Sequence, residues 1–302
     1  MKKTLIVLCG ATGVGKTELS ISLAKYIGSP ILNADSRQIY RELPIGTAAP
    51  TAQEQALVPH YFVGTKSVRD PYNAGMYERD AIALLDELFH SHDALVMAGG
   101  AMMYIDAVCQ GLDNIPQTPA ELRNRITQQY QELGLYWLQE EVKQYDPGYF
   151  ATMADNRNPQ RLIHALEVSM AAGQPYSSFR TATHKQRPFN IIKLELTRPR
   201  EELYDRINRR VDMMLQDGLE DEAHRVYHLR HLNSLQTVGY KEMFDYFDGT
   251  INLNEATRLI KQNSRHYAKR QMTWFRRDND ICRIDLSSHE AWKQINHKID
   301  NI

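Results

Sequence analysis

Residues 10–17 read Gly10-Ala11-Thr12-Gly13-Val14-Gly15-Lys16-Thr17 and fit the phosphate-binding pattern G-x-x-x-x-G-K-[ST]. A strand-like apolar run, residues 4–9, precedes them, and residues 18–26 carry apolar side chains at helical spacing. A strand, a glycine turn and a helix N-terminus together point backbone N–H groups at one spot, where an anion binds. We therefore predict a phosphate loop in which Lys16 reaches the phosphates and the Thr17 hydroxyl holds Mg²⁺. The alternative is a glycine turn that merely joins a strand to a helix.

The composition indicates an ordinary globular protein. The 302 residues suffice for one large domain or for a core with an insert, and the formal net charge of −1 gives no strong field toward nucleic acid. Cys9, Cys109 and Cys282 are widely separated and form no C-x-x-C pair, which favours a reducing compartment over a disulfide framework or a zinc site. The first apolar run is too short for a signal peptide, and no later run could span a bilayer. We expect a cytoplasmic protein without membrane contact.

The order of the expected elements predicts the fold class. Strand-like runs at residues 31–34, 61–63, 94–98 and 191–196 alternate with helical patterns at 73–89, 198–215 and 254–277. This alternation, with a phosphate loop after the first strand, is typical of an α/β protein with a doubly wound parallel sheet.

A change of composition after Gly111 predicts an inserted all-helical domain. Prolines begin the change, and long polar helical segments follow at residues 121–132, 137–145 and 159–172. Strand alternation resumes at residue 191. We therefore predict a core in two parts, 1–113 and 188–302, separated by a helical insertion over 114–187.

Asp35 directly follows the second expected strand. In a doubly wound sheet, ligands lie outside the carboxyl ends of the strands, so Asp35 is expected to project toward the phosphate loop. Helix N-capping is an equally good reading of an Asp at this junction. The buried strand 94–98 contains no acid, and the chain lacks the D-x-x-G and N-K-x-D signatures of a GTPase. These absences argue against nucleotide hydrolysis, because ATPases and GTPases hold Mg²⁺ with such an acid.

Two expected helices are rich in arginine and lysine. In the segment 198–215 the basic residues alternate with acids, which favours a solvated face. In the segment 254–277 few acids interrupt Arg258, Lys261, Arg265 and Lys269, and Trp274 follows closely. A one-sided basic stripe beside aromatic side chains suits a polyanion backbone, although a solvated face is the more common outcome.

Five ordered stretches resemble the tRNA dimethylallyltransferase family of bacterial type and cover most of the chain. These stretches are Gly10–Thr17, Asp35–Ala48, Gln160–Val168, Val238–Glu242 and Ala268–Arg276. The resemblance implies transfer of a dimethylallyl group from its diphosphate to N6 of an adenine next to the tRNA anticodon. The phosphate loop then holds a prenyl diphosphate and Mg²⁺ rather than a nucleotide to be hydrolysed.

The resemblance also implies roles for individual residues. Lys16, Mg²⁺ on Thr17, the loop N–H groups and Arg206 stabilise the departing diphosphate, and Asp35 takes the proton from the adenine amine. The target base must leave its stack to reach them. By this resemblance the insert clamps the anticodon arm. The sequence does not show the oligomeric state, and we take a monomer as the default expectation. Family contacts to tRNA fall on Asp35, Ser36, Arg37, Gln38, Ala101, Arg123, Gln160, Arg161, Leu162, Ile163, His164, Gln236, Thr237, Val238, Gly239, Tyr240 and Lys241.

Two residues depart from the family pattern. Ala101 stands where the family commonly has threonine, so a hydroxyl that would touch the substrate nucleotide is absent. His164 stands where arginine is usual, and an imidazole is only partly charged near neutral pH, which predicts a weaker phosphate contact.

Two other functions remain open from the sequence. A P-loop kinase would use Asp35 to activate a hydroxyl acceptor on a nucleoside or small metabolite, but it needs arginines on a lid for ATP and fewer basic residues on the last long helix. A non-catalytic nucleic-acid-binding switch would need the nucleotide-sensing signatures that are missing here.

Overall fold

The computed structural model describes residues 3–153, 155–182 and 184–299. The chain divides into two compact units. The first, Met1–Gln110 with Gln186–Ile302, is called the sheet unit here, and the second, Gly111–Lys185, the helical unit. The sequence placed the insertion at 114–187, so Arg187 falls on the other side of the boundary. Its guanidinium donates to the carbonyls of Ala107 and Val108 and pairs with Glu78, which ties it to the sheet unit.

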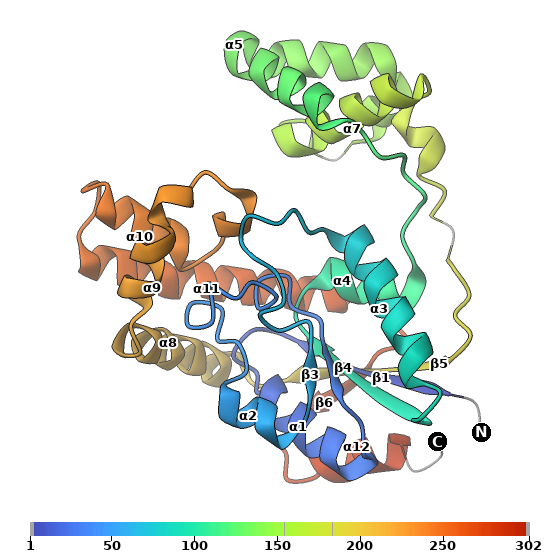
Figure 1. Ribbon diagram of the computed structural model, residues 1–302, viewed down its shortest axis with the longest axis vertical. Helices are drawn as coiled ribbons and strands as arrows, with labels where there is room; N and C mark the ends of the chain where they lie inside the picture. Colours follow the sequence, from blue (N-terminus) through green and yellow to red (C-terminus); the bar gives the residue numbers. More distant parts are fainter. Residues whose placement is uncertain (1–2, 154, 183, 300–302) are drawn as a thin grey trace. The chain divides into compact units, whose positions relative to one another are not determined.

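The sheet unit is built on a six-stranded parallel sheet with the strand order β3-β2-β4-β1-β5-β6 (Figure 1). The central strand β1 pairs with β4 on one side, from Thr4 opposite Ala94 onward, and with β5 on the other. This arrangement confirms the predicted fold class. The strands are β1 Thr4–Gly10, β2 Ile31–Asn33, β3 His60–Tyr61, β4 Ala94–Gly99, β5 Asn190–Thr197 and β6 Cys282–Asp285.

Helices cover both faces of the sheet, which explains why β1 is apolar throughout. Leu5 and Val7 pack with α3 and α4, whereas Ile6 and Leu8 point to the opposite face and pack with α1, α8 and α12 (Figure 1). The helices of this unit are α1 Lys16–Ile27, α2 Ala52–Leu57, α3 Ala74–Leu88, α4 Met102–Gln110, α8 Arg200–Gln216, α9 Leu219–Val226, α10 Tyr240–Phe247, α11 Leu253–Phe275 and α12 Ala291–Ile299, with short 3₁₀ turns η2 Tyr227–Leu229 and η3 Asn233–Leu235.

The helical unit has a hydrophobic core of its own. Ile126, Leu138, Leu162 and Leu166 are fully buried within it. Its longest helix is interrupted at Gly134, whose φ of 81° lies in the left-handed region, so the two helices expected at 121–132 and 137–145 meet at this break. The elements are α5 Ala120–Tyr145, α6 Pro147–Thr152, α7 Pro159–Ala172 and η1 Tyr176–Phe179.

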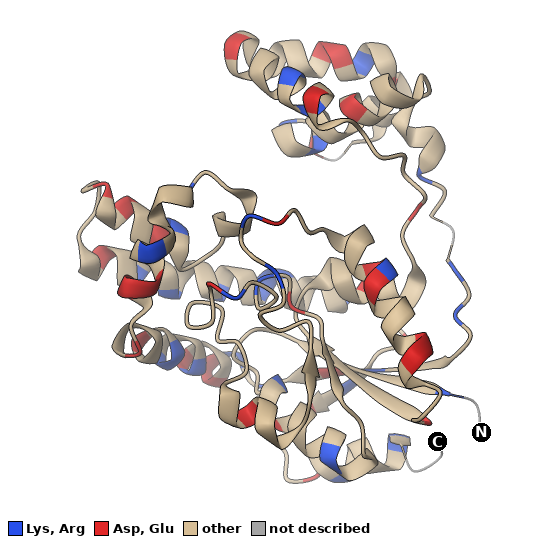
Figure 2. Ribbon diagram, in the orientation of Figure 1, with Lys and Arg blue, Asp and Glu red and all other residues tan. Residues whose placement is uncertain are grey.

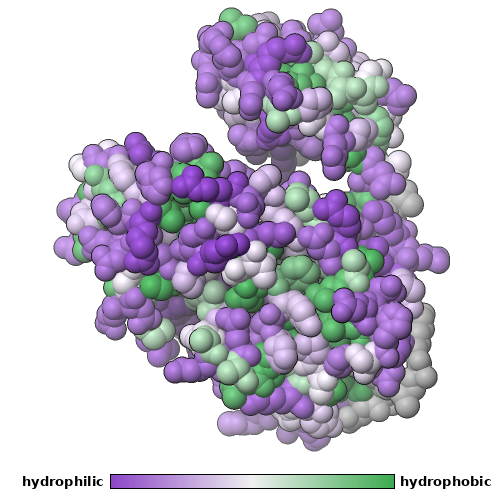
Figure 3. All heavy atoms as spheres, in the orientation of Figure 1, coloured by the Kyte–Doolittle hydropathy of each residue, from purple (hydrophilic) through white to green (hydrophobic). Residues whose placement is uncertain are grey.

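The surface is mostly polar, as the composition of an ordinary globular protein predicts. On the face shown in Figure 3 the exposed atoms are mostly hydrophilic, with hydrophobic atoms in separate patches. Among the helices that the structure describes, none has the length and apolar character needed to cross a bilayer.

The close approach of the paired ends of β4 and β2 leaves no room for a side chain at Gly99. A Cβ there would lie 2.1 Å from the carbonyl oxygen of Ala34, the residue before Asp35. We expect Gly99→Ala to lower the free energy of unfolding by about 1–3 kcal/mol, because the two strand ends must move apart. Urea denaturation measures this. Gly75→Ala, at a helical position where an added Cβ would meet only the Asn73 Oδ1 at 3.4 Å, is the control and should be neutral or stabilising.

Candidate active site

The phosphate loop runs from the end of β1 to the first residue of α1. Gly13 and Gly15 have φ values of 80° and 110°, which only glycine adopts without strain. A Cβ on Gly10 would lie 2.6 Å from the carbonyl oxygen of Leu196 on β5. The Lys16 ammonium donates to the carbonyls of Gly10 and Ala11, each at 2.9 Å, so it lies folded over its own loop with one N–H left for an anion.

Arginines at the start and along one face of α8 surround this loop. Arg206 donates through Nε to the Gly13 carbonyl, and Arg198 in the same way to the Val14 carbonyl, each at 2.9 Å. Arg210 donates to the Thr12 hydroxyl at 3.2 Å and to the Thr47 carbonyl at 3.0 Å. Its Nε is buried and has no hydrogen-bond partner in the described part of the chain.

Burial lowers the pKa of Lys16 to about 8. The negative charge of Asp35 opposes this shift and the positive charge of Arg210 adds to it. Burial also lowers the pKa of Arg210, again against the charge of Asp35. The loop is therefore an enclosed, positively charged cradle, and the Asp35 carboxylate interacts electrostatically with both Lys16 and Arg210. Such a cradle is suited to an anion with several phosphate oxygens.

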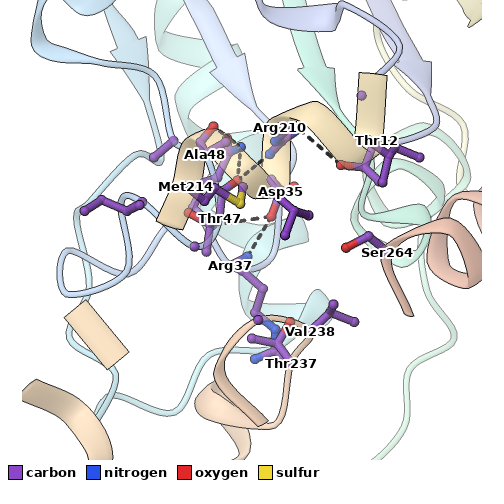
Figure 4. Close-up of a pocket in the computed structure, with 18 of the residues that line it drawn as sticks. Thr12, Asp35, Arg37, Thr47, Ala48, Arg210, Met214, Thr237, Val238 and Ser264 are labelled. Carbon is purple, nitrogen blue, oxygen red and sulfur yellow. Dashed lines mark hydrogen bonds between the residues drawn. The ribbon is translucent and has the colours of Figure 1, made fainter. Parts of the chain in front are cut away.

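Asp35 is not the helix N-cap that the sequence offered as one reading, because residues 36–39 form a turn and no helix follows them. Its Oδ1 accepts the backbone N–H groups of Arg37 at 2.9 Å and Gln38 at 3.4 Å and so holds this turn. The same carboxylate lines a cavity together with Lys16 and Thr17. Figure 4 shows Thr12, Asp35 and Ser264, from three separate segments, around one open space.

The cavity has a volume of about 1400 Å³ and lies entirely within the sheet unit. Pockets for a single small molecule usually measure about 300–1,000 Å³, so this one has room for two ligands. It gathers most of the residues predicted from the sheet unit, namely Thr12, Gly13, Gly15, Lys16, Thr17, Asp35, Ser36, Arg37, Gln38, Arg206, Gln236, Thr237, Val238, Gly239 and Lys241.

The loop of residues 44–49 forms another wall of the cavity, and no pattern in the sequence indicates what holds it. The buried carboxylate of Glu222 accepts the N–H groups of Ile45 at 2.9 Å and Gly46 at 2.8 Å. Gln38 donates to the carbonyls of Thr47 and Ala48. Gln38 therefore shapes the cavity wall with its amide.

Gln271 of α11 joins the phosphate loop to the end of β4. Its Oε1 accepts the Thr12 N–H at 2.9 Å, and its Nε2 donates to the Gly100 carbonyl at 2.8 Å. The side chain is fully buried, and a Cβ on Gly100 would lie 2.3 Å from its Nε2. A buried amide with both ends bonded fixes the position of Thr12 in the cradle. The spacing of residues alone offers no signal for such a contact.

Residues 38–278 match the IPP transferase family. The chain belongs to that family. It is 57% identical over 301 residues to the tRNA dimethylallyltransferase 1 of Phocaeicola vulgatus, with all of both chains covered.

Solved structures agree with this family assignment. A full-length tRNA isopentenylpyrophosphate transferase from Bacillus halodurans is similar with a TM-score of 0.72 and 34% identity, covering 99% of this chain and 96% of that one. A eukaryotic dimethylallyltransferase acting on tRNA is similar with a TM-score of 0.80 and 25% identity, covering 99% and 79%. The resemblance stated from the five sequence stretches is thus confirmed.

Four of the residues expected to contact tRNA have buried side chains. Leu162 and Ile163 are core residues of the helical unit, so their side chains cannot reach an RNA. Tyr240 is fully buried, and its hydroxyl donates to Glu222 at 2.5 Å. Ala101 is buried in the core, and its N–H donates to the Ala34 carbonyl. These four side chains are turned into the core, so any tRNA contact at these positions would have to come from backbone groups.

The remaining contacts expected from the insert lie on the surface of the helical unit. Gln160 and Arg161 are exposed at the start of α7. Arg123 of α5 donates to Gln160 at 3.2 Å and pairs with Glu167 at 2.6 Å, and His164 also bonds to Glu167.

Much of the basic stripe of α11 is already paired within the sheet unit. Arg258 pairs with Glu255 and Lys261 with Asp212, while Arg265 donates to Asn208 at 2.6 Å. Figure 2 shows acidic residues next to basic ones along α8 as well. Lys269 and Arg270 are exposed farther along α11, and Arg270 lines the cavity and lies over the Tyr267 ring. RNA binding by this stripe stays a prediction, and the residues of its C-terminal half have fewer partners within the sheet unit among those described.

Among the described residues, no group of three or more His, Cys, Asp or Glu side chains could hold a metal ion. Cys9, Cys109 and Cys282 are all free thiols. Thr17 lines the cavity beside Asp35. An oxygen donor of this kind suits Mg²⁺, which protein sites usually hold through few side chains together with water and substrate phosphates.

Proposed function

We propose that this chain transfers a dimethylallyl group from dimethylallyl diphosphate to the exocyclic N6 of an adenine next to the tRNA anticodon, releasing diphosphate. The observation that carries the proposal is the cavity in which a cationic phosphate cradle and the carboxylate of Asp35 face the same space. The names of the relatives and of the similar structures support it.

The diphosphate of the donor binds in the cradle. Loop N–H groups, Lys16 and Arg206 neutralise its charge. Thr17 would hold a Mg²⁺ ion, which supplies further positive charge to the phosphate oxygens when bound. Because negative charge grows on the diphosphate as its bond to carbon breaks, these groups bind the transition state more tightly than the ground state.

Asp35 acts as the general base. The new bond joins N6 to the prenyl carbon, the bond from that carbon to the diphosphate oxygen breaks, and the N6 proton passes to the Asp35 carboxylate. The adenine must leave its stack to reach this group, and the size of the cavity leaves room for it.

The tRNA is held by residues of both units. Ser36, Arg37, Gln236, Thr237, Val238, Gly239 and Lys241 border the cavity, and Arg123, Gln160, Arg161 and His164 lie on the helical unit, which grips the anticodon arm. We assign the reaction to a monomer in the cytoplasm, in keeping with the three free cysteines.

The test is incubation of the protein with tRNA, dimethylallyl diphosphate and Mg²⁺ in the absence of ATP, followed by analysis of the tRNA nucleosides. Adenosine carrying a dimethylallyl group on N6 is the expected product. A lack of modified base together with phosphate transfer from ATP to a nucleoside or small metabolite would instead identify a kinase.

The affinity for the prenyl donor should depend on pH through Lys16. With a pKa of about 8, its ammonium is charged below pH 8 and loses its proton above it, so donor binding weakens as the pH rises past 8. We expect the Michaelis constant for dimethylallyl diphosphate to rise by up to about tenfold per pH unit above that point. A steady-state series from pH 7 to 9.5 measures this. In Lys16→Met the rise should be absent; an identical rise there would assign it to another group.

Arg270 should contribute more to tRNA binding than Lys261. Arg270 is exposed at the cavity, whereas Lys261 is already paired with Asp212. We expect Arg270→Ala to weaken tRNA binding and to reduce the slope of log K against log salt by about one. Titrations of labelled tRNA at several salt concentrations give this slope. Lys261→Met is the matched control. Equal slopes for the two variants would show that Arg270 makes no tRNA contact of its own and is simply exposed to solvent.

A further inference from the structure

Glu167 of α7 is a buried carboxylate in the helical unit, with only 2% of its surface exposed. Its Oε1 accepts two hydrogen bonds, from Arg123 Nη1 at 2.6 Å and from His164 Nδ1 at 2.9 Å. Its Oε2 is buried and without a hydrogen-bond partner in the part of the chain that is described. The carboxylate therefore binds the side chains of Arg123 and His164.

Packing alone does not account for a carboxylate at this position. Its neighbours on α7, Leu166 and Val168, are fully buried apolar residues, and an apolar side chain of similar size would fill the same space. Buried ionic groups can often be replaced by well-packed apolar ones without loss of stability. We therefore explain the presence of a carboxylate at position 167 by its hydrogen bonds to Arg123 and His164.

Both partners extend from the buried carboxylate to the surface. The side chains of Arg123 and His164 are 43% and 42% exposed. Arg123 is held further by Gln160, to which its Nη2 donates, and the His164 ring packs edge-on against Tyr176. Because Nδ1 of His164 is bonded to Glu167, the other ring nitrogen is left for a ligand. An arginine fixed in this way loses less side-chain entropy when it binds a phosphate.

We propose that Glu167 is a positioning residue that holds Arg123 and His164 in the orientation in which they bind phosphates of the tRNA backbone. The proposal rests on the assignment of the helical unit to the anticodon arm. Here His164 replaces the longer arginine usual in the family, so its reach depends on how the ring is held.

The sign of the effect separates this role from a simple charge effect. Removal of Glu167 takes one negative charge from the unit, so long-range electrostatics alone predicts tighter binding of tRNA. Loss of positioning predicts weaker binding.

The experiment measures the dissociation constant of full-length tRNA with the complete chain for Glu167→Met and Glu167→Gln. We expect an increase of about tenfold for Glu167→Met, as for the loss of a charge-assisted contact, and a smaller one for Glu167→Gln, which keeps an acceptor. The change should appear in the Michaelis constant for tRNA rather than in kcat. Glu121→Gln, an exposed acid on the first turn of α5, is the control for charge and should bind tRNA equally well or more tightly.

A double-mutant comparison tests whether Glu167 acts through its partners. In an Arg123→Ala/His164→Ala background, Glu167→Met should have no further effect on binding. Should that double variant bind tRNA weakly while both Glu167 variants bind as tightly as the parent or more so, the positioning role is wrong and the anticodon-arm assignment stands. If the double variant binds like the parent, the assignment of these contacts fails, and the inference with it. Glu167→Gln keeps the test decisive should Glu167→Met not fold, which circular dichroism would reveal.

Discussion

Asp35→Asn should lower kcat by a factor of about 10² to 10⁴, as is typical for loss of a general base, while tRNA binding stays nearly unchanged. The amide oxygen of asparagine can still accept the Arg37 and Gln38 N–H groups that Asp35 Oδ1 accepts, so the loop keeps its shape. What the variant loses is the ability to take a proton. Single-turnover transfer of labelled dimethylallyl to tRNA, combined with a tRNA binding titration, measures both quantities.

Asp35→Ala serves as the comparison, because it removes both the base and the acceptor that holds the turn. Its tRNA affinity and thermal stability should fall below those of Asp35→Asn, while its turnover should be no higher. Should Asp35→Asn transfer the prenyl group within a few-fold of the parent rate, Asp35 would only hold the turn of residues 36–39, and another group lining the cavity would have to accept the proton.

The sequence was sufficient for the features that depend on local pattern. The alternation of apolar runs and helical segments predicted the parallel sheet, because a strand buried on both faces must be apolar throughout. The G-x-x-x-x-G-K-[ST] pattern likewise placed the cradle, since its glycines adopt backbone angles that other residues avoid. The sequence analysis did not predict strand β6, because Cys282–Asp285 is only four residues long and carries charges at its exposed positions.

The parts of the site that the sequence missed all depend on contacts between distant segments. Arg210 was placed on a mixed, solvated face, yet it bridges the phosphate loop and the loop of residues 44–49. Gln271 and Glu222 bind backbone groups far away along the chain, and such contacts leave no periodic trace. The same limit applies to Tyr240, whose side chain is buried: a motif marks a residue as important without saying whether its side chain faces the ligand or the core.

The second large effect is expected at Lys16. Lys16→Met keeps the length of the side chain and removes its charge, and we expect turnover to fall by a factor of about 10² to 10³, as when one preorganised donor to a developing anion is lost. The loss should exceed the loss in donor binding, because the charge on the diphosphate is greatest in the transition state. Pre-steady-state transfer rates and the binding of dimethylallyl diphosphate, measured separately, give the two quantities.

Lys25→Met is the matched control, because Lys25 lies exposed in the last turn of the same helix and its replacement removes the same charge. It should leave turnover and donor binding close to those of the parent. Lys16 also holds the carbonyls of Gly10 and Ala11, so a thermal melt is needed to separate a disturbed loop from a lost charge. A stable Lys16→Met variant whose transfer rate is close to that of the parent would contradict the role of Lys16 in stabilising the leaving group. The arginines of α8 would then be the groups that neutralise the departing diphosphate.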